Sequence, residues 1–103
     1  MVKNDTFERT AVTLKMILEK GILQANVKLT SMSNPEVEGV LNEDGSITVV
    51  ANGKKKIFSF PSGAARYIER KSINGWIYWQ IALKDVKYNL SHYRDLYINA
   101  INK

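Results

Sequence analysis

The order of apolar and polar positions divides the chain into helical and extended stretches. Over residues 6–20, apolar side chains recur at the three- and four-residue spacing of a helix, and Gly21 follows as a helix terminator. A second stripe near the end predicts an amphipathic helix over 90–103, with Ser91 as its N-cap. The apolar positions of that last stripe are Tyr93, Leu96, Tyr97, Ala100 and Ile101.

Short extended segments separated by turn residues lie between these helices. The pattern predicts strands at 27–31, 37–42, 46–51 and 56–60. Asn52-Gly53 between two apolar runs is a strong signal of a tight hairpin, and Glu43-Asp44-Gly45 separates the preceding pair. These segments therefore predict an antiparallel meander.

The second half of the chain predicts one more helix and one more strand. A short helix begins at Pro61 and ends near Lys71. After Asn74-Gly75, residues 76–83 alternate, which predicts a strand. One face of that strand would carry Ile77, Trp79, Ile81 and Leu83, and the other Trp76, Tyr78 and Gln80.

Together these elements predict an α+β fold: an N-terminal helix, an antiparallel β-meander, a short central helix, a further antiparallel strand and a C-terminal amphipathic helix. With 103 residues, 45% of them apolar, the chain is long enough for one folded domain over 1–103. The absence of cysteine excludes disulfides, thiolate zinc sites and thiol catalysis. No apolar run approaches the roughly 18 residues of a membrane span, so we expect a cytoplasmic protein with no membrane contact.

The net charge of +5 is concentrated in one part of the chain. Residues 1–53 hold five basic and seven acidic side chains, and residues 72–103 hold four basic and two acidic ones, so these parts cancel. The window 54–71 contains six basic side chains against Glu69 alone. A one-sided positive field attracts polyanions, although charge runs on small domains are also ordinary solvated surfaces. The six cations are Lys54, Lys55, Lys56, Arg66, Arg70 and Lys71.

Signs of catalysis are weak. The one histidine, His92, falls in the first turn of the last predicted helix, where an exposed surface position is expected. Glu69-Arg70-Lys71 and Asp85-Val86-Lys87 match half of a metal-dependent nuclease site, but neither has an evident upstream Asp on a neighbouring strand. We therefore expect no enzymatic activity, no metal and no cofactor.

Two features allow both a binding and a structural interpretation. The junction 59–62 leads from the lysine-rich strand into the second helix. The first amides of this helix, at Ser62, would bind phosphate. Alternatively, the junction is an ordinary strand-to-helix turn. Trp76 and Tyr78 would stack on a base or pack beneath the last helix.

Two stretches of the chain carry a family resemblance: residues 58–68, which include Pro61-Ser62-Gly63-Ala64-Ala65, and the later run Asn74-Gly75-Trp76-Ile77-Tyr78-Trp79. Together they resemble the RAMA domain, a module found beside restriction enzymes and adenine methylases. The similarity spans roughly residues 12–83 and leaves the last helix outside. Phe60 stands where the family usually has a serine. The resemblance implies an α+β DNA-binding module, proposed to sense modified bases, without catalytic activity of its own.

The sequence therefore predicts a surface for double-stranded DNA. The six cations of the window 54–71 would contact phosphates, together with the amides at Ser62. Asn74 would read a base edge, and Trp76 or Tyr78 would stack on an extruded or modified base. Neutralising four to six phosphates predicts a salt slope of about −4 to −5. The alternative is a protein-interaction subunit of a restriction or antiphage system, which binds a restriction or methylase partner or forms a homodimer through the last helix.

Overall fold

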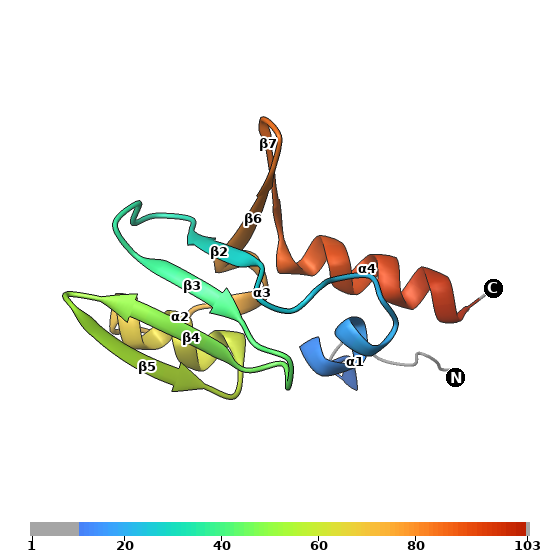
Figure 1. Ribbon diagram of the computed structural model, residues 1–103, viewed down its shortest axis with the longest axis horizontal. Coiled ribbons are helices and arrows are strands. Elements are labelled where there is room, and N and C mark those ends of the chain that lie inside the picture. The colour runs from blue at the N-terminus through green and yellow to red at the C-terminus, as the bar shows by residue number, and fades with distance from the viewer. Residues whose placement is uncertain (1–10, 103) are drawn as a thin grey trace.

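The computed structural model describes residues 11–102 and contains four helices and six strands within them (Figure 1). In chain order the elements are α1 (Leu14–Glu19), β2 (Lys28–Ser31), β3 (Glu38–Leu41), β4 (Ile47–Ala51), β5 (Lys54–Phe58), α2 (Pro61–Glu69), α3 (Gly75–Tyr78), β6 (Trp79–Leu83), β7 (Val86–Asn89) and α4 (Leu90–Ile101). This arrangement confirms the predicted α+β class.

All six strands form one antiparallel sheet in the order β5-β4-β3-β2-β6-β7. The predicted meander is its first part, because β2, β3, β4 and β5 pair with their neighbours in chain order. Strand β6 then returns to pair with β2. The lysine-rich strand β5 therefore lies at one edge of the sheet, with an unpaired outer side.

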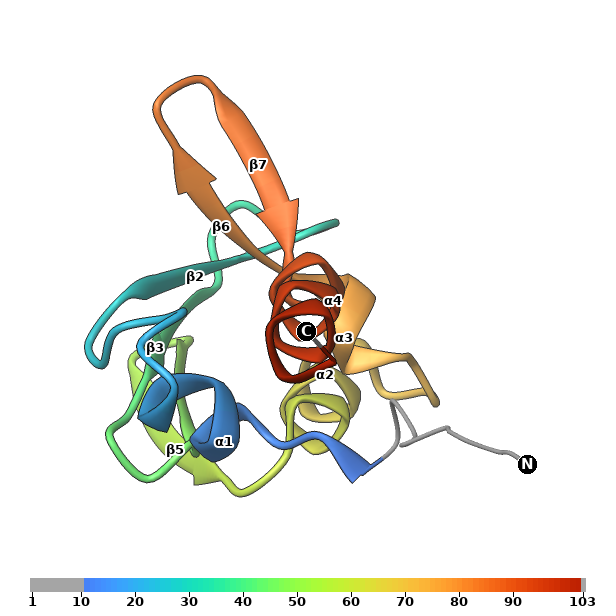
Figure 2. The same cartoon turned by 90° about the vertical axis from the view of Figure 1, so that its right-hand side faces the viewer.

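The helices α2, α3 and α4 lie together on one side of the sheet, and the β6–β7 hairpin extends away from the body (Figure 2). The core between sheet and helices centres on Trp79, which is fully buried. Its indole Nε1 donates a hydrogen bond to the carbonyl oxygen of Pro61 at 3.1 Å. Gly39 lies beneath this ring, where a Cβ would come within 3.3 Å of it. The sequence prediction that Trp79 belongs to the core is thus confirmed.

The predicted Asn52-Gly53 hairpin is confirmed, with one shift in its second strand. Both residues have positive φ angles, 53° and 76°, as a type I′ turn requires. The turn pairs Ala51 with Lys54, so β5 begins at the first lysine rather than at residue 56. Phe60, predicted to end this strand, instead precedes α2 as its N-cap residue and is 68% exposed.

The predicted strand over 76–83 is wrong at its beginning, because residues Gly75–Tyr78 form the short helix α3. The Oδ1 of Asn74 accepts a hydrogen bond from the Trp76 amide and caps this helix. The side-chain alternation predicted for 76–78 is therefore lost, and Tyr78 is buried while Ile77 is 39% exposed. Strand β7, which follows a tight turn at Lys84-Asp85, was not predicted from the sequence.

The terminal helices also differ from their predictions in their bounds. The first helix spans only Leu14–Glu19 within the described residues, and the predicted part before residue 11 lies outside them. Gly21 follows it with a φ of 85°, as expected of a terminator. The last helix is capped by Asn89, whose Oδ1 accepts from the His92 amide, and not by Ser91.

Candidate nucleic-acid interface

The lysines of β5 divide between the two faces of the sheet. In the β4–β5 pair, Lys54 and Lys56 lie opposite Ala51 and Val49, on the face covered by α2. Lys55 lies opposite Val50 and points to the other face, since successive side chains of a strand alternate. The prediction that all cations of this window share one continuous surface is therefore wrong for Lys55.

Lys56 lies over an aromatic ring, and a second aromatic ring packs against the first. The Nζ of Lys56 lies 5.1 Å from the centre of the Tyr67 ring, within the range of a cation–π interaction. The ring of Phe58 packs against the same tyrosine at a centroid distance of 5.2 Å. Lys56 nevertheless remains exposed, so its ammonium group stays available to a ligand.

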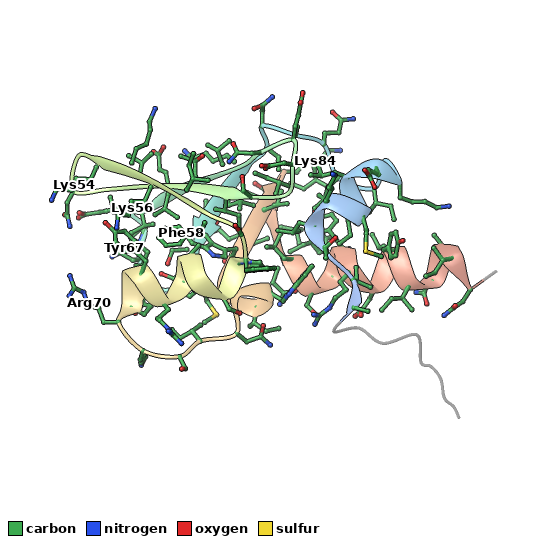
Figure 3. The ribbon with its side chains drawn as sticks, turned by 90° about the horizontal axis from the view of Figure 1, so that it is seen from below. Lys54, Lys56, Phe58, Tyr67, Arg70 and Lys84 are labelled. Atoms are coloured by element: carbon green, nitrogen blue, oxygen red, sulfur yellow. The ribbon has the colours of Figure 1, made fainter. Side chains whose placement is uncertain are left out.

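Arg70 approaches this pair from the end of α2. It has a left-handed conformation with a φ of 63°, and its amide donates to the carbonyl of Arg66 at 2.7 Å, which ends the helix. Figure 3 shows Lys54, Lys56 and Arg70 at the same end of the molecule, around Phe58 and Tyr67. We call these three cations the cationic end.

The single carboxylate of the window 54–71, that of Glu69, is hydrogen-bonded to hydroxyl groups. Oε2 of Glu69 accepts hydrogen bonds of 2.7 Å from the hydroxyls of both Tyr78 and Ser33. The bond from Tyr78, followed by that from Ser33, lowers the pKa of Glu69, and the charge of Lys71 contributes further. Within residues 11–102 an ion pair joins Lys28 and Glu38 at 3.6 Å, whereas none joins a carboxylate to any of the six predicted cations.

Arg66 and Lys71 do not belong to the cationic end as defined here. Arg66 lines a separate hollow beside Ser62, Gly63 and Ile73, on another face of α2. Lys71 is exposed and follows Arg70. The structure therefore brings together half of the predicted cations and spreads the others around them.

A small groove opens next to the cationic end, with a volume of about 160 Å³. Three segments distant in sequence form it: the β2–β3 loop, the β4–β5 turn and the last turn of α2. Its lining residues are Asn34, Glu36, Val37, Ala51, Asn52, Tyr67, Ile68 and Arg70. Arg70 is the one residue among these that the sequence predicted to bind DNA. The Asn52-Gly53 signal located one wall, but no local pattern indicates that the three segments meet.

The residues that carry the family resemblance form a structural junction. The Ser62 hydroxyl accepts a hydrogen bond from the Gly75 amide at 2.9 Å, and a Cβ on Gly75 would overlap the carbonyl of Pro61. With the Trp79 indole bonded to the same carbonyl, this motif locks the start of α2 against α3. The Ser62 side chain is thus occupied within the fold, while phosphate binding by the amides at this position stays a prediction.

Both rings proposed for base stacking are used by the protein itself. Tyr78 is 1% exposed, and its hydroxyl accepts a hydrogen bond from Ser31 at 2.6 Å while donating to Glu69. Of the two alternatives for Tyr78, the structure supports packing within the protein and not stacking on a base, because α3 turns the ring into the core. Trp76 is half-buried beneath Arg94 of α4, whose guanidinium carbon lies 4.5 Å from its ring centre. Asn74 is exposed, but its carbonyl oxygen caps α3.

The last helix covers its own domain with part of its aromatic face. Tyr93 is buried and Tyr97 is half-buried against the core, whereas Leu96 is 42% exposed. On the projecting hairpin, Leu83 and Val86 are exposed and paired with each other. These apolar side chains, rather than the tyrosines, remain open to a protein partner.

Neither half-site for a nuclease is completed in the described part of the chain. Glu69 is bonded to hydroxyls, and Asp85 lies at the tip of the β6–β7 hairpin. Among residues 11–102, no three His, Asp or Glu side chains are grouped so as to hold a metal ion. In the same part of the chain, no helix is both long and apolar enough to cross a bilayer.

Comparison with known proteins gives a family for the chain. No curated protein matches it. A family model described as Restriction Enzyme Adenine Methylase Associated, RAMA, matches residues 2–103. The match includes the last helix, which lay outside the resemblance seen in the sequence. Since it covers essentially the whole sequence, the chain belongs to the RAMA family.

Proposed function

We propose that this domain is a non-enzymatic module that binds double-stranded DNA, with Lys54, Lys56 and Arg70 on the phosphate backbone. One observation carries the proposal: cations from β5 and α2 extend from the same end of the molecule, while Glu69 is held elsewhere. An unpaired positive cluster attracts DNA and gains affinity from counterion release.

The aromatic support of this cluster favours binding. A lysine already placed over a tyrosine ring loses less side-chain entropy when it contacts a phosphate than a fully mobile one does. Arg70 extends from a helix end with a defined backbone conformation. The cationic end is thus partly ordered before DNA arrives.

The division of the cations reduces the expected number of phosphate contacts. Three side chains face one backbone together, and Lys55, Arg66 and Lys71 lie around them. Three contacts predict a slope of log affinity against log salt of about −2.7, weaker than the value expected for six aligned cations. Affinity should then fall about 40-fold between about 50 and 200 mM salt.

Fluorescence anisotropy with a labelled mixed-sequence duplex tests this proposal. Lys54→Ala and Arg70→Ala should each weaken binding and reduce the salt slope by about 1. Lys84→Ala is the matched control, because it removes the same charge at the hairpin tip, away from the cationic end (Figure 3). Circular dichroism checks that each variant folds.

Equal losses in all three variants would mean that only net charge matters and would remove the cationic end as the site. A wild-type protein that binds no duplex would refute the function as a whole. The alternative of a subunit that contacts a restriction or methylase protein would then be favoured, with Leu83 and Val86 as its exposed surface.

The same proposal extends to modified bases. The family description names adenine methylases, so N6-methyladenine is the first modification to test. Matched duplexes with and without this base, titrated at two salt concentrations, separate base discrimination from backbone affinity. Identical affinities at both concentrations would limit the module to backbone binding.

A further inference from the structure

The groove beside the cationic end contains a carboxylate that phosphate binding does not explain. Glu36 lies in its lining together with Arg70, and two asparagines, Asn34 and Asn52, stand on the loops that form its walls. A carboxylate repels phosphate, but it accepts hydrogen bonds from the amino group of a base. The composition therefore differs from that of a phosphate site, although cations border it.

We infer that this groove reads a base edge that presents an amino group, N6 of adenine or N4 of cytosine, with Glu36 as the acceptor. The inference rests on the proposed DNA binding and names the part of DNA that the same end of the molecule recognises. Glutamate pairs with the cytosine amino group in known readout, and asparagine bonds both edge atoms of adenine. The lining thus matches donors on a base.

The size of the groove fits an edge presented from outside. Its volume of about 160 Å³ lies below the roughly 300–1,000 Å³ of pockets that enclose a small-molecule ligand. A base that stays attached to its DNA strand needs only its edge inside. Tyr67 and the buried Val37 are also among the residues that line the groove.

Hydrogen bonds fix the loop that carries the acceptor. Ser31 Oγ accepts hydrogen bonds from the backbone amides of Ser33 and Asn34. Asn34 Oδ1 accepts a hydrogen bond of 3.1 Å from the backbone amide of Glu36. The loop conformation is therefore set before any ligand binds. Arg70 lines this groove, and Lys54 pairs with Ala51 at the turn that forms one of its walls. Backbone contacts by these cations would therefore position a base edge for Glu36, in the usual division between phosphate and base contacts.

Selection from a pool of random-sequence duplexes, read by sequencing, tests the inference. The wild type should enrich adenine or cytosine at one position of one strand by about tenfold over guanine and thymine. Glu36→Ala should lose this preference. Glu38→Ala is the matched control, because Glu38 is an exposed acid two residues away that pairs with Lys28 on the open face of the sheet. It should keep the preference.

The sign of the affinity change decides between base reading and simple repulsion. On the enriched duplex, Glu36→Ala should bind more weakly than the wild type, even though it removes a negative charge. If Glu36→Ala gained affinity equally for every duplex, or if the wild type bound DNA without a preferred base, the inference would be overturned. The proposal of backbone binding would remain intact. Absence of all duplex binding would instead refute the proposed function and this inference with it.

Discussion

Replacement of Tyr78 by phenylalanine tests the hydrogen-bond network that holds Glu69. The Tyr78 hydroxyl lies at the centre of this network. It accepts a hydrogen bond of 2.6 Å from the Ser31 hydroxyl and donates one of 2.7 Å to the Glu69 carboxylate. The substitution removes both bonds and leaves the shape of the buried ring unchanged.

The expected loss follows from these two bonds. A typical intramolecular hydrogen bond contributes about 0.5–1.5 kcal/mol to stability, so loss of the buried bond to Ser31 and the partly buried bond to Glu69 should cost about 1–3 kcal/mol. With a typical dependence on urea for a domain of this size, the midpoint of unfolding should fall by roughly 1 M at an unchanged slope. Urea titration followed by tryptophan fluorescence at about pH 7 measures this shift.

The loss should also depend on pH, in a direction set by Glu69. Its pKa in the folded state lies below the ordinary value of 4.5, chiefly because Tyr78 donates to it. A carboxyl group whose pKa is lower in the folded state than in the unfolded state stabilises the fold at pH values above its unfolded-state pKa. This stabilisation is lost as the pH falls through the folded-state pKa. The difference between wild type and variant should therefore narrow below about pH 4.5.

Tyr97→Phe is the matched control, because the Tyr97 hydroxyl has no hydrogen-bond partner among residues 11–102. It should shift the midpoint little. An unchanged midpoint in Tyr78→Phe would show that this network does not stabilise the fold. A loss of stability that stays constant into the acid range would show that the ionised carboxylate of Glu69 does not contribute to it.

Further substitutions at Gly75 and Asn52 test the positions where backbone geometry restricts the residue type, with Gly63 as the comparison. Gly75→Ala should destabilise the protein by about 3 kcal/mol or more in thermal or urea unfolding, because its Cβ would overlap the Pro61 carbonyl. At Gly63 a Cβ would meet only Phe58, at 3.9 Å, so Gly63→Ala should stabilise the protein by about 0.4–1 kcal/mol. Equal effects at the two glycines would contradict the close packing of Gly75 against Pro61. Asn52→Ala should cost about 1–2 kcal/mol because its φ is 53°, whereas Asn52→Gly should be nearly neutral; a neutral alanine variant would contradict the type I′ turn.

Local sequence patterns predicted most of the sheet and the position of the charge. Asn52-Gly53 specifies a tight hairpin, because both residues tolerate positive φ, and the apolar runs around it predicted paired strands. The concentration of cations in 54–71 follows directly from composition. Alternation along β5 also implies that Lys55 and its neighbours face opposite sides, although the charge count alone suggested one surface.

The same kind of pattern failed at Trp76 and Tyr78. A short aromatic run is compatible with a helical turn and with a strand, and only length and flanking residues separate the two. Asn74 was the local signal that could have decided it, because its side chain caps α3. The predicted roles of both rings in stacking depended on the wrong choice.

By itself, the sequence determined the α+β class, the hairpin turns of the meander and the excess of positive charge, because these depend on residues close together in the chain. Only the tertiary structure decided that Tyr78 holds Glu69 and that Glu36, Asn52 and Tyr67 line one groove. Contacts between distant segments depend on how sheet and helices pack, and no short window of sequence records that packing.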